Sequence, residues 1–204
     1  MFLKKIYLTI FIIFFMIIGG GSGCEQKSET LTAQPTPAPK TPEPAKSSEP
    51  TPAPKPKLNM ILTSPAFVNN SNIPAEYTCS KNELSPQLNI ANVPENTKSL
   101  ALIMDDPDAP NGTWIHWVVF NIDPKTTIIN KNSAPNGSVQ GKNSWGNSNY
   151  GGPCPPSGTH RYFFKLYALD NTLSLGSSAT KASVETAMKG HILSQVTLIG
   201  KYAK

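Results

Sequence analysis

The sequence predicts an all-β sandwich with one or two short helices in residues 58–204 of the 204-residue chain. Two observations lead to this class: short runs rich in β-branched and aromatic residues, and clusters of Pro, Asn, Gly and Asp between them. The expected strands are 58–64, 87–93, 98–104, 114–122, 161–169 and 195–203. Many short strands separated by turn residues are typical of a β-sandwich.

Alternation along two of these strands predicts which faces are buried. In 114–122 both faces are mostly apolar, so this strand is expected inside a sheet with both faces covered. One face would carry Trp114, His116, Val118, Phe120 and Ile122, and the other Ile115, Trp117, Val119 and Asn121. In the strand after residue 160, one face would carry His160, Tyr162, Phe164, Leu166 and Ala168. Its other face is more polar and is expected to be partly solvated.

One helix and one long loop complete the expected domain. The helix spans about 181–189, with Thr180 as N-cap and Gly190 as its stop. Residues 123–150 form a long, polar, Asn-rich loop, for which Trp145 and Tyr150 are the candidate anchors.

The N-terminal 23 residues have the layout of a secretory signal. Lys4 and Lys5 precede an apolar stretch at 6–18, and small residues lead to Cys24. Gly21, Ser22 and Gly23 resemble a bacterial lipobox, although that motif usually has Leu where Gly21 stands. We therefore expect lipidation of Cys24; the alternatives are an ordinary signal peptide cleaved elsewhere and an uncleaved anchor.

Residues 24–57 are expected to form a disordered, Pro-rich tether. Residues 25–57 hold nine of the chain's twenty prolines and no aromatic residue, so the segment buries too little apolar surface to offset its ordering entropy. The expected location is extracytoplasmic, as a membrane-anchored lipoprotein of the cell envelope.

Charge argues against nucleic acid as a partner. Residues 58–204 carry eleven Lys and Arg against nine Asp and Glu, a net charge of +2. There is no basic run and no interleaving of basic and aromatic residues. No cofactor is expected. In an oxidising compartment Cys79 and Cys154 can pair, but the sequence leaves open whether they meet.

His116 and His160 carry the site prediction. Each stands where a strand begins, after a loop of small or ring-shaped residues, which predicts one shared pocket. Asp106 and Asp108 precede His116; a carboxylate beside an imidazole fixes the tautomer and raises the histidine pKa. Alternatively, these aspartates only make turns at a strand end.

The segment 151–156, GGPCPP, is expected to form a rigid collar round a small polar group. Gly151 and Gly152 allow main-chain N–H groups to approach a ligand. The prolines at 153, 155 and 156 would supply stiff apolar walls.

Other chemistries fit less well. The motifs GxSxG, HExxH and CxxC are absent from the sequence. A metal triad of His116, His160 and Asp106, or a Cys154 nucleophile beside His160, stay as alternatives. His191 is expected to be structural.

At these residues the sequence resembles the phosphatidylethanolamine-binding protein family, in its short bacterial and archaeal branch often called Raf-kinase-inhibitor-like. The similarity rests on DDPDAP at 105–110, WIHWVVFNI at 114–122, GGPCPPSGTHRY at 151–162, EYTCS at 76–80 with SPQL at 85–88, and GHILSQVTLIGKY at 190–202. It covers the chain from about residue 58 to the end.

The resemblance implies two antiparallel sheets and an edge pocket for phosphate-like groups, including the phosphatidylethanolamine head group. The ligand-binding residues it implies are Asp106, Asp108, Pro110, Trp114, His116, Gly152, Pro155, Pro156, His160 and Tyr162. The chain ends at Lys204 without the C-terminal helix of eukaryotic members, so a more open pocket is expected. We expect non-enzymatic binding of an anion or head group; the alternatives are an inhibitor or sensor of a protein partner and a metal-dependent or hydrolytic enzyme.

Overall fold

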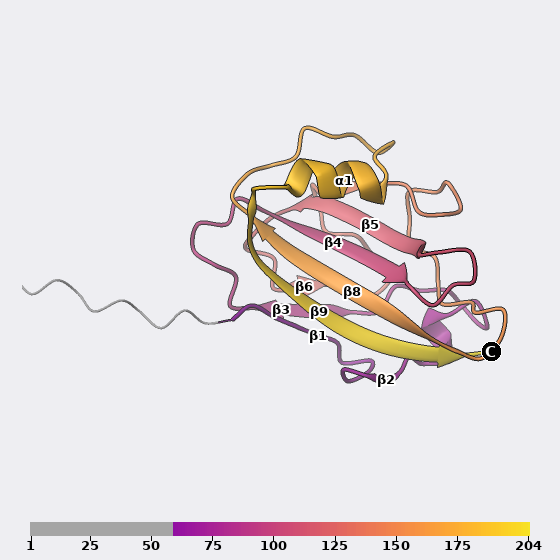
Figure 1. Cartoon of the computed structure of the whole chain (residues 1–204). Helices are drawn as coiled ribbons and strands as arrows, with labels where there is room; N and C mark the ends of the chain where they lie inside the picture. The colour runs from indigo at the N-terminus through magenta and orange to yellow at the C-terminus, as the bar shows by residue number, and fades with distance from the viewer. Residues whose placement is uncertain (1–58) are drawn as a thin grey trace, which may run out of the picture. The chain divides into compact units, whose positions relative to one another are not determined.

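The computed structural model describes residues 59–204 (Figure 1). The expected signal segment 1–23, Cys24 and the tether 24–57 lie outside the described residues. In the described part the elements are β1 (Ile61–Thr63), β2 (Ser71–Asn72), the 3-10 turn η1 (Ala75–Tyr77), β3 (Leu88–Ala91), β4 (Ser99–Asp106), β5 (Trp114–Ile122), β6 (Ile128–Ile129), β7 (Val139–Gln140), β8 (Thr159–Leu169), α1 (Lys181–Met188) and β9 (Ile192–Ala203). Over residues 59–204, no helix has both the length and the apolar character needed to span a membrane.

Two sheets form the predicted sandwich. The larger has the order β2-β9-β8-β4-β5-β7, and the smaller has the order β1-β3-β6. All strand pairs are antiparallel except β2 with β9, where Ser71 pairs with Gly200 and Asn72 with Lys201 in parallel. The prediction of two antiparallel sheets is therefore confirmed, with one parallel pair at the edge of the larger sheet.

The larger sheet is covered on both faces (Figure 1). Between the sheets lies one core, which includes Leu88, Leu102, Met104, Trp117 and Phe164. Between the sheet and α1 lies a second core, which includes Ala101, Ile103, Val118, Phe120 and Val184. Every residue of β4 is buried, because both of its faces are covered.

The face prediction for β8 is confirmed. Tyr162, Phe164, Leu166 and Ala168 belong to the core between the sheets. On the opposite face Phe163, Lys165 and Tyr167 are half-buried and Arg161 is exposed.

The helix prediction is also confirmed. Thr180 is the N-cap of α1: its side chain accepts the N–H of Ser183, and the Ser183 side chain accepts the N–H of Thr180 in return. Gly190 follows the helix with φ +80, a conformation that L side chains rarely adopt.

The face prediction for β5 is wrong at both ends of the strand, including Ile115, which packs on the side of Val118, because the strand contains two irregularities. Met104 pairs with Trp117 but the next residue of β4, Asp105, pairs with Ile115, so His116 is an extra residue on β5. His116 consequently points to the same side as Trp117, against Tyr162, and not to the side of Val118. A second shift, at Asn121 with φ 56, turns Ile122 into the core between the sheets.

The loop 123–150 is partly ordered by two-residue strands that the sequence did not predict, β6 and β7. Tyr150 is an anchor, as expected: its hydroxyl donates to the carbonyl of Tyr77 at 2.8 Å and its ring packs on Trp117. Trp145 lies at the surface, 45% exposed.

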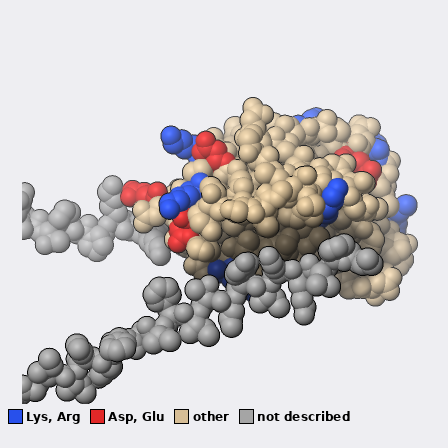
Figure 2. Space-filling view, turned by 90° about the horizontal axis from the view of Figure 1, so that it is seen from above, with Lys and Arg blue, Asp and Glu red and all other residues tan. Residues whose placement is uncertain are grey.

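Charged side chains are scattered over the α1 face of the molecule. Figure 2 shows that Lys and Arg do not gather there into a patch. This distribution agrees with the near-neutral composition of residues 58–204.

Candidate anion-binding site

A pocket of about 480 Å³ lies where β4 ends and where β5 and β8 begin. These ends coincide because β5 and β8 are both antiparallel to β4. The size is suited to a small ligand. The pocket is lined by Cys79, Glu83, Asp106, Ala109, Pro110, Asn111, Trp114, His116, Trp145, Cys154, Pro156 and His160.

His160 is oriented by Asp106. Its Nδ1 lies 2.7 Å from Oδ2 of Asp106, and the two side chains are only 10% and 5% exposed. The other carboxylate oxygen accepts the N–H of Asp108 at 2.8 Å. A carboxylate oxygen accepts, so Nδ1 of His160 carries the proton. Nε2 of His160 makes no hydrogen bond within residues 59–204 and is the ring nitrogen left for a ligand.

His116 is oriented by the main chain. Its Nδ1 donates to the carbonyl of Gly151 at 2.8 Å, which also leaves Nε2 without a protein partner in the described part of the chain. Burial lowers the pKa of His116 below its usual 6.5, although Asp106 and the Gly151 carbonyl act in the opposite direction. The Asp106 carboxylate therefore raises the His116 pKa, as expected, but burial outweighs it, and the His116 ring is neutral at pH 7.

Asp108 does not face the pocket. It forms a two-pronged pair with Arg161, at 2.9 Å to Nε and 2.7 Å to Nη2, and also accepts the Arg161 main-chain N–H. These hydrogen bonds lower the pKa of Asp108 to about 2. Of the two aspartates, Asp106 therefore orients His160, whereas Asp108 attaches the β4–β5 loop to Arg161 at the start of β8.

The two glycines of the collar allow close packing. The N–H of Gly151 donates to the carbonyl of His116, and the N–H of Gly152 donates to Glu83 at 3.2 Å. The expectation that these N–H groups approach a ligand is therefore wrong, because both are bonded within the protein. A Cβ on Gly151 would collide with the Trp145 ring. A Cβ on Gly152 would come within 2.9 Å of the Thr78 main chain.

The other predicted residues divide between wall and support. Pro110, Trp114 and Pro156 line the pocket, whereas Pro155 is buried behind it. Tyr162 is fully buried and supports the His116 ring edge-on, with ring centroids 5.2 Å apart. Burial raises the pKa of the Tyr162 hydroxyl, so it stays protonated.

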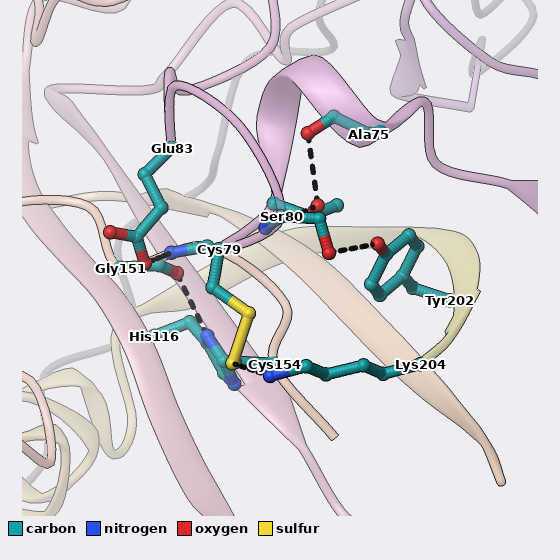
Figure 3. Close-up of a disulfide and its surroundings, with 11 residues drawn as sticks. Ala75, Cys79, Ser80, Glu83, His116, Gly151, Cys154, Tyr202 and Lys204 are labelled. Carbon is teal, nitrogen blue, oxygen red and sulfur yellow. Dashed lines mark hydrogen bonds between the residues drawn. A yellow bond between two sulfur atoms is a disulfide. The ribbon is translucent and has the colours of Figure 1, made fainter. Parts of the chain in front are cut away.

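A disulfide joins Cys79 to Cys154, which answers the question that the sequence left open (Figure 3). The Cα atoms are 5.5 Å apart, and the N–H of Cys79 also donates to the carbonyl of Pro153 at 3.1 Å. Nζ of Lys204, at the chain end, lies 3.9 Å from Sγ of Cys154. The disulfide fixes the segment that carries Glu83 against the collar.

The sequence prediction missed two prominent pocket residues, Glu83 and Trp145. Glu83 adopts φ 52 and comes from a segment distant in sequence from both histidines, so no local pattern marked it. The sequence marks Trp145 only as a candidate anchor of the loop 123–150. In the structure its ring contacts His116 and Trp114 edge-on, with centroids 5.2 Å and 5.3 Å away.

Comparison with known proteins assigns the chain and its fold to a family. The family model described as phosphatidylethanolamine-binding protein matches residues 63–203. The chain belongs to the phosphatidylethanolamine-binding protein family. A UPF0098 protein from Methanothermobacter thermautotrophicus is 51% identical over 150 residues, covering 71% of this chain and 99% of that protein. A UPF0098 protein from Aquifex aeolicus is 45% identical over 152 residues, covering 71% of this chain and 89% of the relative.

Two solved structures have the same fold. A phosphatidylethanolamine-binding protein homologue from Chlamydia trachomatis is 42% identical with a TM-score of 0.69, covering 72% of this chain and 98% of that one. YbcL of E. coli, a member of the same family, is 29% identical with a TM-score of 0.68, covering 72% and 99%. Both of these chains consist almost entirely of the matched domain, so the fold forms in these relatives without a segment like residues 1–58.

The family assignment supports a ligand-binding role, and the names of these UPF0098 relatives carry no enzymatic function. No group of three His, Cys, Asp or Glu side chains is arranged as a metal site within residues 59–204. Asp106 binds Nδ1 of His160 and so acts as a partner of the imidazole, not as a third ligand beside it.

Proposed function

We propose that this pocket binds, without catalysis, a small phosphate-bearing anion or a phospholipid head group. The observation that supports this most is the pair of imidazoles, His116 and His160, which line one pocket with Nδ1 already bonded and Nε2 left for a ligand. Nε2 donates when the ring is protonated and accepts when it is neutral. A phosphate group supplies oxygens for the first case and, as a protonated monoester, a P–OH for the second.

The charges around the pocket define the conditions for binding. Asp106 is paired with His160, His116 is neutral at pH 7, and Glu83 lines the mouth. The pocket is therefore not a cationic trap for a dianion. It fits a phosphate group that brings a proton or that carries a balancing positive charge.

The wider setting is also a proposal. Residues 1–24, with the features of a lipoprotein signal, support an extracytoplasmic domain attached to a membrane through Cys24. The alternatives, an inhibitor or sensor of a protein partner and a metal-dependent or hydrolytic enzyme, stay predictions of the sequence.

Phosphorus NMR titration of residues 59–204 with phosphate and phosphoethanolamine tests the binding. We expect saturable binding by the parent domain and loss of at least tenfold in affinity in the double variant His116→Gln, His160→Gln. His191→Gln is the matched control, since His191 pairs with Asp170 and does not line the pocket. Equal affinity of the parent and the double variant would contradict the proposal.

A further inference from the structure

Two stretches that form most of the pocket mouth carry no charged side chain. Residues 109–115 and 143–159 contain no Asp, Glu, Lys or Arg, whereas such residues make up 15% of the whole chain. Asp108, Lys142 and Arg161 stand just outside these limits, and Asp108 is paired with Arg161. Glu83 and Asp106 line the pocket, and Lys204 lies beside Cys154. We call residues 109–115 and 143–159 the uncharged rim.

Two exposed tryptophans stand in the uncharged rim, beside the pocket. Trp114 is 37% exposed and Trp145 is 45% exposed, and their rings contact each other edge-on. Large apolar side chains exposed side by side mark an interaction site more often than isolated ones do. Pro110 and Pro156 extend the apolar surface on either side of the pocket.

We infer that the uncharged rim docks on the surface of a phospholipid bilayer, with Trp114 and Trp145 inserted at the level of the head groups. The inference rests on the proposed function, because it places the pocket over lipid phosphates in the intact membrane. Three properties favour a bilayer as the occupant. Indole rings prefer the membrane–water interface. A surface without charges loses less hydration energy than a charged surface when it meets lipid. The proposed phosphate pocket, which both indoles line, would then lie at the depth where lipid phosphates are found.

The lack of charge on the rim also predicts how lipid charge and ionic strength affect the docking. Because the uncharged rim offers no cation to anionic lipids, the docking does not need a negatively charged surface. Association with neutral phosphatidylcholine and phosphatidylethanolamine vesicles should therefore change little with ionic strength, unlike docking through basic residues.

Vesicle flotation of residues 59–204 tests the docking, without any contribution from the N-terminal segment. The parent domain should float with phosphatidylcholine–phosphatidylethanolamine vesicles, and lipids brominated near the head group should quench its tryptophan fluorescence. Trp117 is 1% exposed and supplies the unquenched remainder. The variant Trp114→Gln, Trp145→Gln should lose at least fivefold in vesicle partitioning.

Two further variants make the test specific. Ile192→Gln removes a side chain of similar exposure, 44%, at the start of β9, which is the strand end opposite the pocket, and should leave flotation unchanged. Thr113→Glu with Ser157→Glu adds charge to the uncharged rim outside the pocket lining, and should reduce flotation while soluble glycerophosphoethanolamine still binds.

The outcomes separate the docking from the proposed function. A parent domain that does not float, or tryptophan and charge variants that float as the parent does, would overturn the docking, whatever the soluble ligand does. Flotation that needs both tryptophans but is unaffected by His116→Gln, His160→Gln would support the docking and count against the head-group pocket.

Discussion

At the scale of single residues, the proton on His116 couples the pocket to pH. Its pKa in the folded domain is lowered below 6.5 by burial, so the unfolded chain takes up this proton first as the pH falls. The stability contributed by the neutral ring is complete above pH 6.5 and is lost as the pH falls through the lowered pKa. In the proposed complex, a phosphodiester favours the protonated ring and acts in the opposite direction.

We therefore predict that affinity for glycerophosphoethanolamine rises as the pH falls below 6.5. This ligand keeps its charge across the range, so the change reports on the protein. For a single coupled proton the gain is at most about tenfold per pH unit. Calorimetric titration at pH 7.5, 6.5 and 5.5 measures it, and His116→Gln should reduce the slope. An affinity independent of pH would contradict the role of His116 as a donor to the anion.

Under the proposed function, Glu83 selects ligands by their charge. Its carboxylate lines the mouth and accepts the Gly152 N–H, so a dianion entering the pocket meets a negative charge. We predict that Glu83→Gln raises the affinity for inorganic phosphate at pH 8 severalfold and changes the affinity for zwitterionic phosphoethanolamine less. Titration of both ligands measures the difference. Glu76→Gln is the control, since Glu76 is exposed and pairs with Lys131; weaker phosphate binding in Glu83→Gln would instead mean that its contact with Gly152 shapes the collar.

At the scale of elements, the sequence predicts the long strands and the helix, because their residues follow a local pattern. The strands β4, β5, β8 and β9 and the capped helix α1 follow from period-two patterns and a Thr–Gly boundary. The two-residue strands β2, β6 and β7 are too short to have a pattern of their own and exist because a neighbouring strand pairs with them. The extra residue at His116 is set by pairing with β4 and reverses the side that alternation predicts.

The collar packs closely against the segment that carries Thr78, and Gly152 makes this packing possible. A methyl group on Gly152 would lie 2.9 Å from the Thr78 main chain. Because this contact is too short, the backbone segments that carry Gly152 and Thr78 would have to move apart. We predict that Gly152→Ala destabilises the domain by about 1–3 kcal/mol, as overpacking does. Urea unfolding measures this loss. Gly176→Ala is the matched control, because a Cβ added there would meet nothing within 4 Å and the φ of Gly176 is not positive; equal midpoints for the two variants would show that the segments separate freely.

At the scale of the whole molecule, the pocket is a consequence of topology. Residues from β4, β5 and β8 meet at one end of the larger sheet because β4 runs between two strands of opposite direction. The sequence could therefore predict one shared pocket from two histidines at strand starts. It could not predict Glu83, which is brought to the pocket by a segment that crosses from one sheet to the other, between β2 and β3.

The disulfide joins that crossing segment to the collar. Cys79 lies between a strand of the larger sheet and a strand of the smaller one, while Cys154 precedes β8, at a sequence separation of 75. Closing a loop of that length stabilises the fold by roughly 4 kcal/mol in the chain-entropy account. For a domain of this size, we expect Cys79→Ser with Cys154→Ser to lower Tm by about 10 °C.

Calorimetry of the parent domain and of the double serine variant, each with and without dithiothreitol, measures the effect. Reductant should bring the parent to the Tm of the variant and leave the variant unchanged. Phosphate affinity should fall along with Tm, because release of the crossing segment frees both Glu83 and the wall formed by the two sulfurs. If the reduced parent kept its Tm and its affinity, the hydrogen bonds from Cys79 to Pro153 and from Tyr150 to Tyr77 would be enough to hold the crossing segment in place.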